Sequence, residues 1–466
     1  MSEWTFDEIA RVACGQWLIA PAAEAKPPIR AAIDSREIEA GMLFVAFKGE
    51  RVDGHQYLDQ AQRSGAAMAI ATDTHAVPSQ IEMPVLLVDD ATDALERLAS
   101  RWREILKDLR VIGVTGSNGK TTTCRLLFSA ACSGERGFAG SRTRKSYNNA
   151  IGVPLTLLNA TPDDRVLVCE MGMSTPGEIA ARCRTARPDA AIITTVSGAH
   201  LEGLGSIESI AREKASIAAQ LTVDAPLFIP SGIDILEEAL GALPNRPRVI
   251  RVGLGTDHEL ALLPNVGTGT RFVLDGHEYE IGLDGAHNAM NASLAVLAAR
   301  WLGASQDCIR IGLAGSQGPP MRLERSVVKA DPPIMVINDA YNANLASMRA
   351  ALDVLATTDA RGRRVAVLGD MLELGASEAD MHAEILKEAE HREFLVLTLG
   401  PRFAAIRGEV EKDTGREAVG RIADQINPGD AVLLKGSRGM RVERVLDELR
   451  VRFENTSWSD RSKVDA

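Results

Sequence analysis

The sequence predicts an α/β protein of three domains, and three observations support this class. The chain has 466 residues, and at roughly 100–200 residues per domain three domains are the natural division. Two long stretches alternate short apolar strands with helical patterns, which is typical of parallel sheets. Polar clusters follow several of these strands, where ligands bind in such sheets. We therefore expect domains at residues 1–105, 106–307 and 308–466.

The first expected domain mixes short strands with helices. Its apolar runs predict buried strands at residues 42–47, 67–71 and 85–88, and its amphipathic patterns predict helices at residues 59–65 and 91–106. The second helix is long enough to lead the chain into the next domain.

The second expected domain alternates strand, loop and helix. Strands are predicted at residues 111–114, 166–169 and 190–194, a helix at residues 207–221, and a hairpin at residues 270–281 that turns at Asp275-Gly276. Polar residues follow the second and third strands, beginning at Glu170 and Ser197.

A second alternating pattern begins near residue 308. Strands are predicted at residues 334–337, 365–368, 394–397 and 431–434. All but the third run into polar clusters, which begin at Asn338, Gly369 and Lys435. The third domain is therefore expected to carry ligand contacts at the same edge of its own parallel sheet.

Composition excludes several classes of protein. The net charge of −11 argues against a general nucleic-acid binder, which needs a basic surface. Six cysteines without a CxxC pair predict neither a disulfide framework nor a zinc site. The polar, acidic N-terminus does not resemble a signal peptide, and no apolar run is long enough for membrane insertion. A cytoplasmic protein is expected.

A glycine-rich loop is the strongest functional motif. Residues 113–123 read GVTGSNGKTTT and join a strand to a helix. Glycines let backbone N–H groups approach phosphate oxygens, and the helix N-terminus adds a positive field. Lys120 is suited to the β- and γ-phosphates of ATP, and the Thr121 hydroxyl to Mg²⁺. Val114 stands where the strict Walker pattern has glycine, so a plain glycine turn is the alternative interpretation.

Three titratable residues of the second expected domain are considered for metal binding or catalysis. Glu170 ends a strand and could reach Mg²⁺, although a solvated acid would look the same. His200 follows the next strand, a place that favours a ligand over a structural histidine. Lys214 lies in a helical stretch, where an exposed lysine is the simplest expectation.

Another polar cluster precedes an alanine-rich helix. His287, Asn288 and Asn291 carry side chains that could hydrogen-bond a base or a ribose. The alternative is structural, because Asn288 could cap the helix by itself.

Taken together, these motifs resemble the Mur ligases, which build the peptide of bacterial cell-wall precursors, and within that family the MurF type. The similarity covers nearly the whole chain, and the variant phosphate loop has the form found in this family. The matching segments are residues 34–36, 41–49, 53–55, 115–122, 148–154, 170–172, 199–202, 285–288, 339–344, 368–375 and 435–438.

The resemblance implies a fold and a reaction. A small N-terminal α/β domain would hold the UDP end of the substrate, a central P-loop ATPase-like sheet would bind ATP, and a Rossmann-like domain would complete the site. ATP with Mg²⁺ would activate the carboxylate of UDP-N-acetylmuramoyl-tripeptide as an acyl phosphate, which the amine of D-alanyl-D-alanine would attack. Lysine or diaminopimelate at the third peptide position, and the oligomeric state, stay open, with a monomer expected.

Roles of single residues follow from the same resemblance. Lys120 would contact the γ-phosphate, His200 would help to hold a second Mg²⁺, and Lys214 matches a lysine that the family carbamylates. These three are the expected catalytic residues, and Thr121, Glu170, His200 and Lys214 the expected metal site. Nucleotide contacts are expected from Gly116, Ser117, Asn118, Gly119, Lys120, Thr121, Thr122, His287, Asn288, Asn291, Arg322 and Asp339, and substrate contacts from Ser35, Arg36, Asn148 and Asn149.

Three positions depart from the family pattern. Thr195 replaces an asparagine, Leu345 replaces a proline, and Pro320-Met321-Arg322 lacks a glycine before the arginine. None removes an expected metal or phosphate ligand. A sister ligase that adds a single amino acid, a folylpolyglutamate synthetase and an inactive nucleotide-binding relative are the alternatives, and the segment after Asp370 favours the MurF type over the first.

Overall fold

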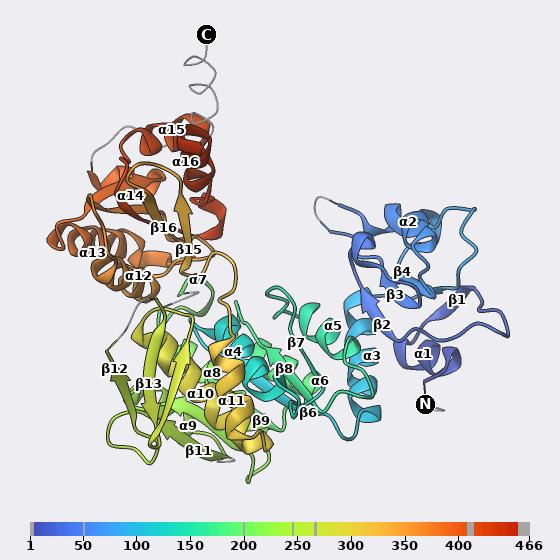
Figure 1. Cartoon of the computed structure of the whole chain (residues 1–466). Helices are drawn as coiled ribbons and strands as arrows, with labels where there is room; N and C mark the ends of the chain where they lie inside the picture. Colours follow the sequence, from blue (N-terminus) through green and yellow to red (C-terminus); the bar gives the residue numbers. More distant parts are fainter. Residues whose placement is uncertain are drawn as a thin grey trace.

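Four β-sheets organise the chain (Figure 1). The computed structural model describes residues 4–49, 52–198, 201–244, 247–264, 268–407 and 414–454. Strands and helices lie where the alternating patterns predict them, so the α/β class is confirmed.

The N-terminal sheet has five strands in the order β1-β5-β4-β3-β2, and only β1 is antiparallel to its neighbour. Two of its three inner strands, β3 and β4, are apolar and fully buried, as parallel strands covered on both faces require. The elements are α1 (Phe6–Ala13), β1 (Gln16–Ile19), β2 (Arg30–Ala32), β3 (Met42–Val45), α2 (Leu58–Arg63), β4 (Met68–Ala71), β5 (Val85–Leu87) and α3 (Ala91–Ile105).

The central sheet has six parallel strands in the order β11-β10-β9-β6-β8-β7. Strand β6 lies between β8 and β9, so the phosphate loop that follows β6 faces the polar segments that follow its two neighbours. The elements are β6 (Arg110–Thr115), α4 (Lys120–Cys132), β7 (Gly140–Arg142), α5 (Gly152–Leu158), β8 (Val166–Glu170), α6 (Glu178–Ala186), β9 (Ala190–Ile193), α7 (Leu201–Leu204), α8 (Ile207–Ala215), β10 (Pro226–Pro230), α9 (Asp234–Gly241) and β11 (Arg248–Val252).

A small antiparallel sheet, ordered β12-β13-β14, adjoins the central sheet. Its hairpin turns at Asp275 and Gly276, both at positive φ, as predicted. Helix α11 packs against α4, so the expected domain boundary at residues 307–308 falls within a helix of the central region. The elements are β12 (Leu260–Leu263), β13 (Thr270–Leu274), β14 (His277–Ile281), α10 (Ala286–Leu302) and α11 (Gln306–Ala314).

The C-terminal sheet has five strands in the order β15-β16-β19-β17-β18, with only β15 antiparallel. Strands β16, β19 and β17 are neighbours, and their carboxyl ends lie side by side. The elements are β15 (Glu324–Val328), β16 (Ile334–Asp339), α12 (Leu345–Thr357), β17 (Arg364–Gly369), α13 (Glu378–His391), β18 (Leu395–Leu399), α14 (Pro401–Arg407), α15 (Arg416–Asp424), β19 (Ala431–Lys435) and α16 (Arg444–Glu454).

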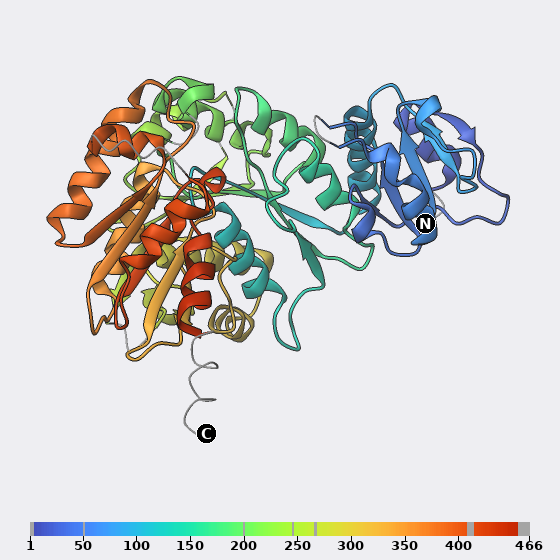
Figure 2. The same ribbon diagram turned by 90° about the horizontal axis from the view of Figure 1, so that it is seen from above.

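The N-terminal and C-terminal sheets lie at opposite ends of the central region in both views (Figures 1 and 2). Sites between domains must therefore form on two different sides of the central sheet. Among the described helices, none is both long and apolar enough to cross a membrane.

Candidate active site

The phosphate loop between β6 and α4 is held by the neighbouring strand β9. Gly116 has φ 149°, and a Cβ atom there would lie 1.9 Å from the Thr194 hydroxyl, so only glycine fits. Gly119 has φ 82° and packs against the Asn291 side chain. The Ser117 hydroxyl donates to the Ser197 carbonyl at 2.9 Å. The loop is therefore fixed before any ligand binds.

Lys120 begins helix α4 and turns back over the loop. Its Nζ donates to the carbonyls of Gly116 at 2.7 Å and Ser117 at 3.4 Å. Burial lowers the pKa of Lys120, and the carboxylate of Glu170 opposes this shift. The ammonium group of Lys120 and the backbone N–H groups of the loop could therefore contact the same phosphate group.

Glu170 ends strand β8 and is 1% exposed. Its Oε1 accepts a hydrogen bond from Asn148 Nδ2 at 2.7 Å, whereas its Oε2 is buried and has no partner within the described part of the chain. The Thr121 hydroxyl, at the start of α4, accepts from Arg322 Nη2 at 3.2 Å. A buried carboxylate oxygen without a partner and a hydroxyl at a phosphate loop suit Mg²⁺.

Lys214, on helix α8, is buried rather than exposed, which contradicts the simplest expectation for a helical lysine. Burial holds the pKa of its ammonium group well below the ordinary value, and the positive charge of Lys120 adds to the shift. His200 lies outside the described residues. No group of three or more His, Cys, Asp or Glu side chains suited to a metal occurs among the residues described.

A cavity of about 280 Å³, here called the nucleotide cavity, lies between the phosphate loop, helix α10 and the C-terminal domain. Ser117, Asn118, Gly119, Lys120, Thr122, His287, Asn288, Asn291, Arg322 and Asp339 line it. The structure therefore brings together most of the residues expected at the nucleotide. Gly116 and Thr121 lie in the adjoining loop and helix turn.

Asn288 does not cap helix α10, contrary to the alternative considered from the sequence. The N-cap residue is Gly285. Asn288 Nδ2 instead donates to the Asp284 carbonyl at 2.8 Å, and its Oδ1 accepts from Asn291 Nδ2 at 3.2 Å. This chain of amides lies against the phosphate loop because Asn291 touches Gly119.

Residues of the C-terminal domain close the nucleotide cavity. The guanidinium of Arg322 lies 4.2 Å from the ring centroid of Tyr341, within the range of a cation–π contact. Asp339 Oδ2 accepts from Lys435 Nζ at 2.7 Å, and its Oδ1 accepts from the Leu323 backbone N–H at 3.1 Å. These contacts fix the segment that carries Arg322.

The departures from the family pattern have structural roles. Thr195 Oγ1 accepts from the Asn118 backbone N–H at 3.0 Å and so supports the phosphate loop. Leu345 is the first residue of helix α12, a position where proline is common for its fixed φ but is not required. Met321 and Leu323 flank Arg322 with φ 56° and 54°, an unfavourable backbone held by the contacts of Asp339.

A second cavity of about 250 Å³, here called the reaction cavity, lies against the nucleotide cavity. Lys120, Arg322, Tyr341 and Asn342 line both cavities. The other residues that line the reaction cavity include Asn148, Asn149, Glu170, Arg182 and Lys214. The cationic side chains of Lys120 and Arg322 thus face both cavities. A phosphoryl group that passes from the nucleotide cavity to the reaction cavity would pass beside them.

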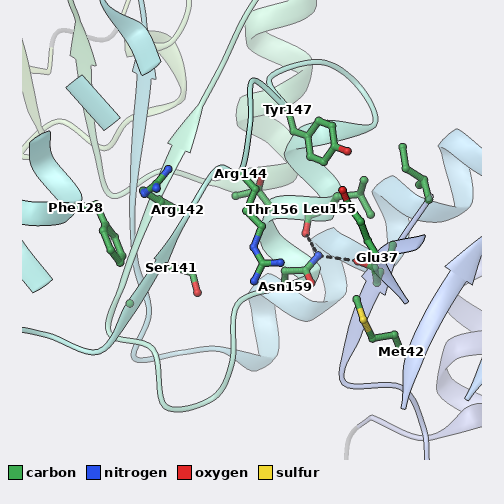
Figure 3. A pocket seen from close by; sticks show the side chains of 14 residues that line it. Glu37, Met42, Phe128, Ser141, Arg142, Arg144, Tyr147, Leu155, Thr156 and Asn159 are labelled. Atoms are coloured by element: carbon green, nitrogen blue, oxygen red, sulfur yellow. Dashed lines mark hydrogen bonds between the residues drawn. The ribbon is translucent and has the colours of Figure 1, made fainter. Parts of the chain in front are cut away.

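A third cavity of about 280 Å³, here called the interdomain cavity, lies between the N-terminal sheet and the central region (Figure 3). Arg142 lies beside the ring of Phe128, 5.6 Å from its centroid, and Arg144 extends toward Asn159. Asn159 Nδ2 donates to the Ala31 carbonyl across the domain boundary at 2.8 Å. The two arginines suit an anionic ligand.

The interdomain cavity does not use the residues expected in the N-terminal domain. The Ser35 hydroxyl donates to Gln60 at 2.8 Å, and Arg36 lies at the surface, where it pairs with Asp34. Glu37 lines the cavity instead. A role for Ser35 or Arg36 in substrate binding stays a prediction.

Several residues that line the cavities were not among the expected site residues. Tyr341 and Asn342 follow strand β16, and Lys435 is the last residue of strand β19. All three belong to polar clusters that the sequence places at strand ends. Arg142, Arg144 and Arg182 gave no such signal, because no recognisable motif surrounds them. Arg142 ends strand β7, Arg144 lies in the loop after it, and Arg182 lies within helix α6.

Three family models match successive parts of the chain. Residues 31–103 match the Mur ligase family, catalytic domain; residues 114–299 match the Mur ligase middle domain; and residues 321–438 match the Mur ligase, glutamate ligase domain. The chain belongs to the Mur ligase family.

Curated relatives of this Mur ligase carry one activity in their names. The UDP-N-acetylmuramoyl-tripeptide–D-alanyl-D-alanine ligase of Bacillus subtilis is 36% identical over 90% of this chain and 92% of its own length. The ligase of the same name from Escherichia coli is 33% identical over 89% and 92%.

Solved structures agree with the fold of this Mur ligase. MurF from Acinetobacter baumannii superposes with a TM-score of 0.80 at 31% identity, covering 96% of this chain and 98% of that one. MurF of Thermotoga maritima, solved with ADP, has a TM-score of 0.75 at 28% identity and covers 92% and 98%. FolC of Escherichia coli, at 20% identity and a TM-score of 0.57, shares only the fold.

Proposed function

We propose that this Mur ligase uses ATP to join D-alanyl-D-alanine to the peptide carboxylate of UDP-N-acetylmuramoyl-tripeptide. The observation that carries the proposal is the wall shared by the nucleotide and reaction cavities, where Lys120 and Arg322 face both. The named activity of its full-length relatives supplies the substrates.

Amide formation from a carboxylate needs activation, because the carboxylate oxygen is a poor leaving group. The carboxylate attacks the γ-phosphorus of ATP, the bond to ADP breaks, and an acyl phosphate forms. The dipeptide amine then attacks the acyl carbon, loses its proton, and inorganic phosphate leaves. Lys120 and Arg322 offset the charge that develops on the transferring phosphoryl group.

Thr121 and Glu170 are the residues suited to hold Mg²⁺. Magnesium takes one or two carboxylates together with phosphate oxygens and water, and the free Oε2 of Glu170 fits this demand. When bound, the ion neutralises phosphate charge. We assign His200 to a second ion on the family resemblance alone.

Lys214 is assigned as a carbamate. It lies in the reaction cavity with Lys120 and Glu170, and its lowered pKa favours the neutral amine, the form that reacts with CO₂. The carbamate replaces a buried positive charge by a negative one, which Lys120 beside it would stabilise.

The remaining expected residues surround the nucleotide. His287, Asn288 and Asn291, on helix α10, face the base and ribose, and Asp339 holds the hinge segment that brings Arg322 to the phosphates. Asn148 orients Glu170 through its amide, and Asn149 lies in the same cavity.

The UDP-linked substrate spans two cavities. Arg144 and Tyr147 line the interdomain cavity, and Ser146 and Asn148 of the same segment line the reaction cavity. The diphosphate therefore lies near Arg142 and Arg144, and the peptide carboxylate lies near Lys120. A monomer stays the expected oligomeric state. The six cysteines are free thiols, as expected in the cytoplasm.

Phosphate release tests this function. The purified chain with ATP, Mg²⁺, UDP-N-acetylmuramoyl-tripeptide and D-alanyl-D-alanine should release phosphate and form the pentapeptide product, and EDTA should stop the reaction. Release with single amino acids instead would indicate a sister ligase, and no release would indicate an inactive relative. Tripeptides with lysine or diaminopimelate identify the third residue.

A further inference from the structure

Helix α7, a single turn at Leu201–Leu204, lies where the central region meets the C-terminal domain (Figure 1). The side chain of Leu204 is buried in a hydrophobic core that it shares with helices α6 and α8, and this anchors α7 to the central region. None of the four described residues of α7 lines the nucleotide, reaction or interdomain cavity. Any part that α7 plays in the reaction must therefore be indirect.

One side of α7 packs against the wall of the reaction cavity. A Cβ atom on Gly203 would lie 2.1 Å from the Ser174 carbonyl oxygen, far closer than van der Waals contact allows. Only glycine therefore permits this approach of two backbone segments. Ser174 lines the reaction cavity together with Gly172 and Met173. A shift of α7 would thus change the position of this part of the wall.

The wall segment at residues 174–178 is held together by one carboxylate. The backbone N–H groups of Ser174 and Thr175 donate to Glu178 Oε2 at 2.5 and 3.0 Å. The other oxygen of this carboxylate accepts from Arg182 Nη2 at 3.0 Å. Glu178 and Arg182 both line the reaction cavity. Because these groups are linked, a displacement of Ser174 would be passed on to two charged side chains of the cavity.

Another side of α7 touches the C-terminal domain. The Glu202 N–H donates to the Glu373 carbonyl at 3.3 Å. Apolar side chains add to the contact, because Leu201 and Met381 both come within 4 Å of the place that a Cβ atom on Gly198 would take. Helix α7 therefore lies in contact with the cavity wall and with the C-terminal domain at the same time.

The segment of the C-terminal domain that touches α7 is firmly held. His382 is fully buried, and its Nε2 accepts from the Met371 N–H at 2.9 Å. Its Nδ1 donates to the Glu378 carbonyl at 2.7 Å. Met371 lies two residues before Glu373, so the carbonyl that meets α7 has a fixed place within the C-terminal domain.

We infer that α7 couples the docking of the C-terminal domain to the shape of the reaction cavity. The docked domain holds α7 through Glu373, and α7 holds the wall at Ser174 through the close contact of Gly203. Gly203 is thus a positioning residue, which acts through Ser174. The inference rests on the proposed function for the reaction that the cavity serves. The coupling places the wall correctly when the docked domain brings Arg322 to the same cavity.

Gly203→Ala in the full-length enzyme tests this coupling. The added methyl group meets the Ser174 carbonyl and separates α7 from the wall. The kcat for pentapeptide formation should then fall by about 10- to 100-fold, as for a misplacement of about 1 Å, while the KM for ATP stays within about twofold. Gly241→Ala, at the end of α9, is the matched control, because a Cβ atom there would meet no described neighbour within 4 Å, and its kcat should equal that of the wild type.

Met381→Ala tests the same path from the C-terminal side. It removes an apolar contact beside Leu201 without adding bulk, and by itself it should lower kcat by about threefold. In the Gly203→Ala background it should cause little further loss, because the path through which it acts is already broken. Effects that multiply, a Gly203→Ala kcat within about twofold of wild type, or a loss of ATP affinity as large as the loss of kcat, each overturn the inference.

Hydrogen exchange followed by mass spectrometry tests the coupling without turnover. Gly203→Ala should speed exchange at residues 172–178, Met381→Ala should do so to a smaller extent, and Gly241→Ala should not. Exchange at residues 172–178 that neither of the first two variants changes overturns the inference. If these exchange differences are seen but the wild type releases no phosphate with the tripeptide and the dipeptide, the proposed function is overturned instead, so the two failures are distinguishable.

Discussion

The nucleotide cavity and the interdomain cavity have the same volume, about 280 Å³, but they hold their charged groups differently. In the nucleotide cavity, Lys120 and Asp339 are fixed by short hydrogen bonds to backbone or to a buried partner. In the interdomain cavity, Arg144 is exposed and makes no side-chain hydrogen bond to any other described residue.

This difference predicts that the two cavities have different roles, one in catalysis and one in substrate binding. Groups fixed in advance stabilise charge that develops during a reaction, because they need no reorganisation at that moment. An exposed cation at a domain boundary, such as Arg144, contributes mainly to the binding of a ligand. Substitutions at the first cavity should therefore lower kcat, and substitutions at the second should raise KM.

The largest effect is expected for Lys120→Met. Removing the ammonium group that faces both the nucleotide and reaction cavities should lower kcat by about 10²- to 10³-fold. Steady-state phosphate release measures it, and Lys107→Met, at an exposed position before β6, is the matched control. A change confined to KM would contradict the catalytic role assigned to the nucleotide cavity.

A smaller loss is expected when CO₂ is removed. Because the pKa of Lys214 is lowered, its amine is neutral at pH values where an exposed lysine, with a pKa of about 10.4, is charged. Activity in bicarbonate-free buffer should fall by about tenfold and return on adding bicarbonate, since only the carbamate can bind the metal.

Lys214→Arg separates this effect from a general action of bicarbonate. Arginine at this position cannot form the carbamate, so the low activity of the variant should not respond to bicarbonate. A wild type equally active with and without CO₂ would exclude the carbamate.

Arg142→Met tests the interdomain cavity. The KM for UDP-N-acetylmuramoyl-tripeptide should rise by about tenfold with kcat nearly unchanged, as for the loss of a charge-assisted contact. Arg63→Met is the control, because it removes an exposed arginine that pairs with Asp59 and does not line the cavity. If Arg36→Met had the larger effect, the sequence-based assignment would be right and the cavity assignment wrong.

The smallest effect is expected for Asn344→Ala. It removes the amide pair with Asn118 and a capping side chain of helix α12, which together should cost about 1–2 kcal/mol of stability. Thermal unfolding should show a lower Tm, and kcat should fall by about threefold through looser domain docking. An unchanged Tm would mean that the pair contributes nothing.

Much of this fold follows from the sequence because its signals are local. Apolar runs such as 111–114 and 166–169 became β6 and β8, and the Asp275-Gly276 turn formed as predicted. The phosphate loop was also recognisable, since one continuous segment supplies its glycines, its lysine and its hydroxyl groups.

The features that the sequence did not predict depend on tertiary packing. The burial of Lys214 could not be read from a helix that carries other charged residues, and its role came from the family resemblance. Arg142 and Arg144 gave no signal because the interdomain cavity is assembled from separate elements of two domains. The sequence also allowed Asn288 to be the N-cap of helix α10, but in the structure the N-cap residue is Gly285.

Two of the contacts that join the domains, one on each side of the central sheet, differ in kind. Asn118 and Asn344 meet as neutral amides, whereas Lys145 and Glu37, which connect the central region to the N-terminal sheet, form an exposed ion pair. Salt weakens an exposed ion pair and acts little on a hydrogen bond between amides. Added salt should thus weaken the Lys145–Glu37 contact more than the Asn118–Asn344 contact.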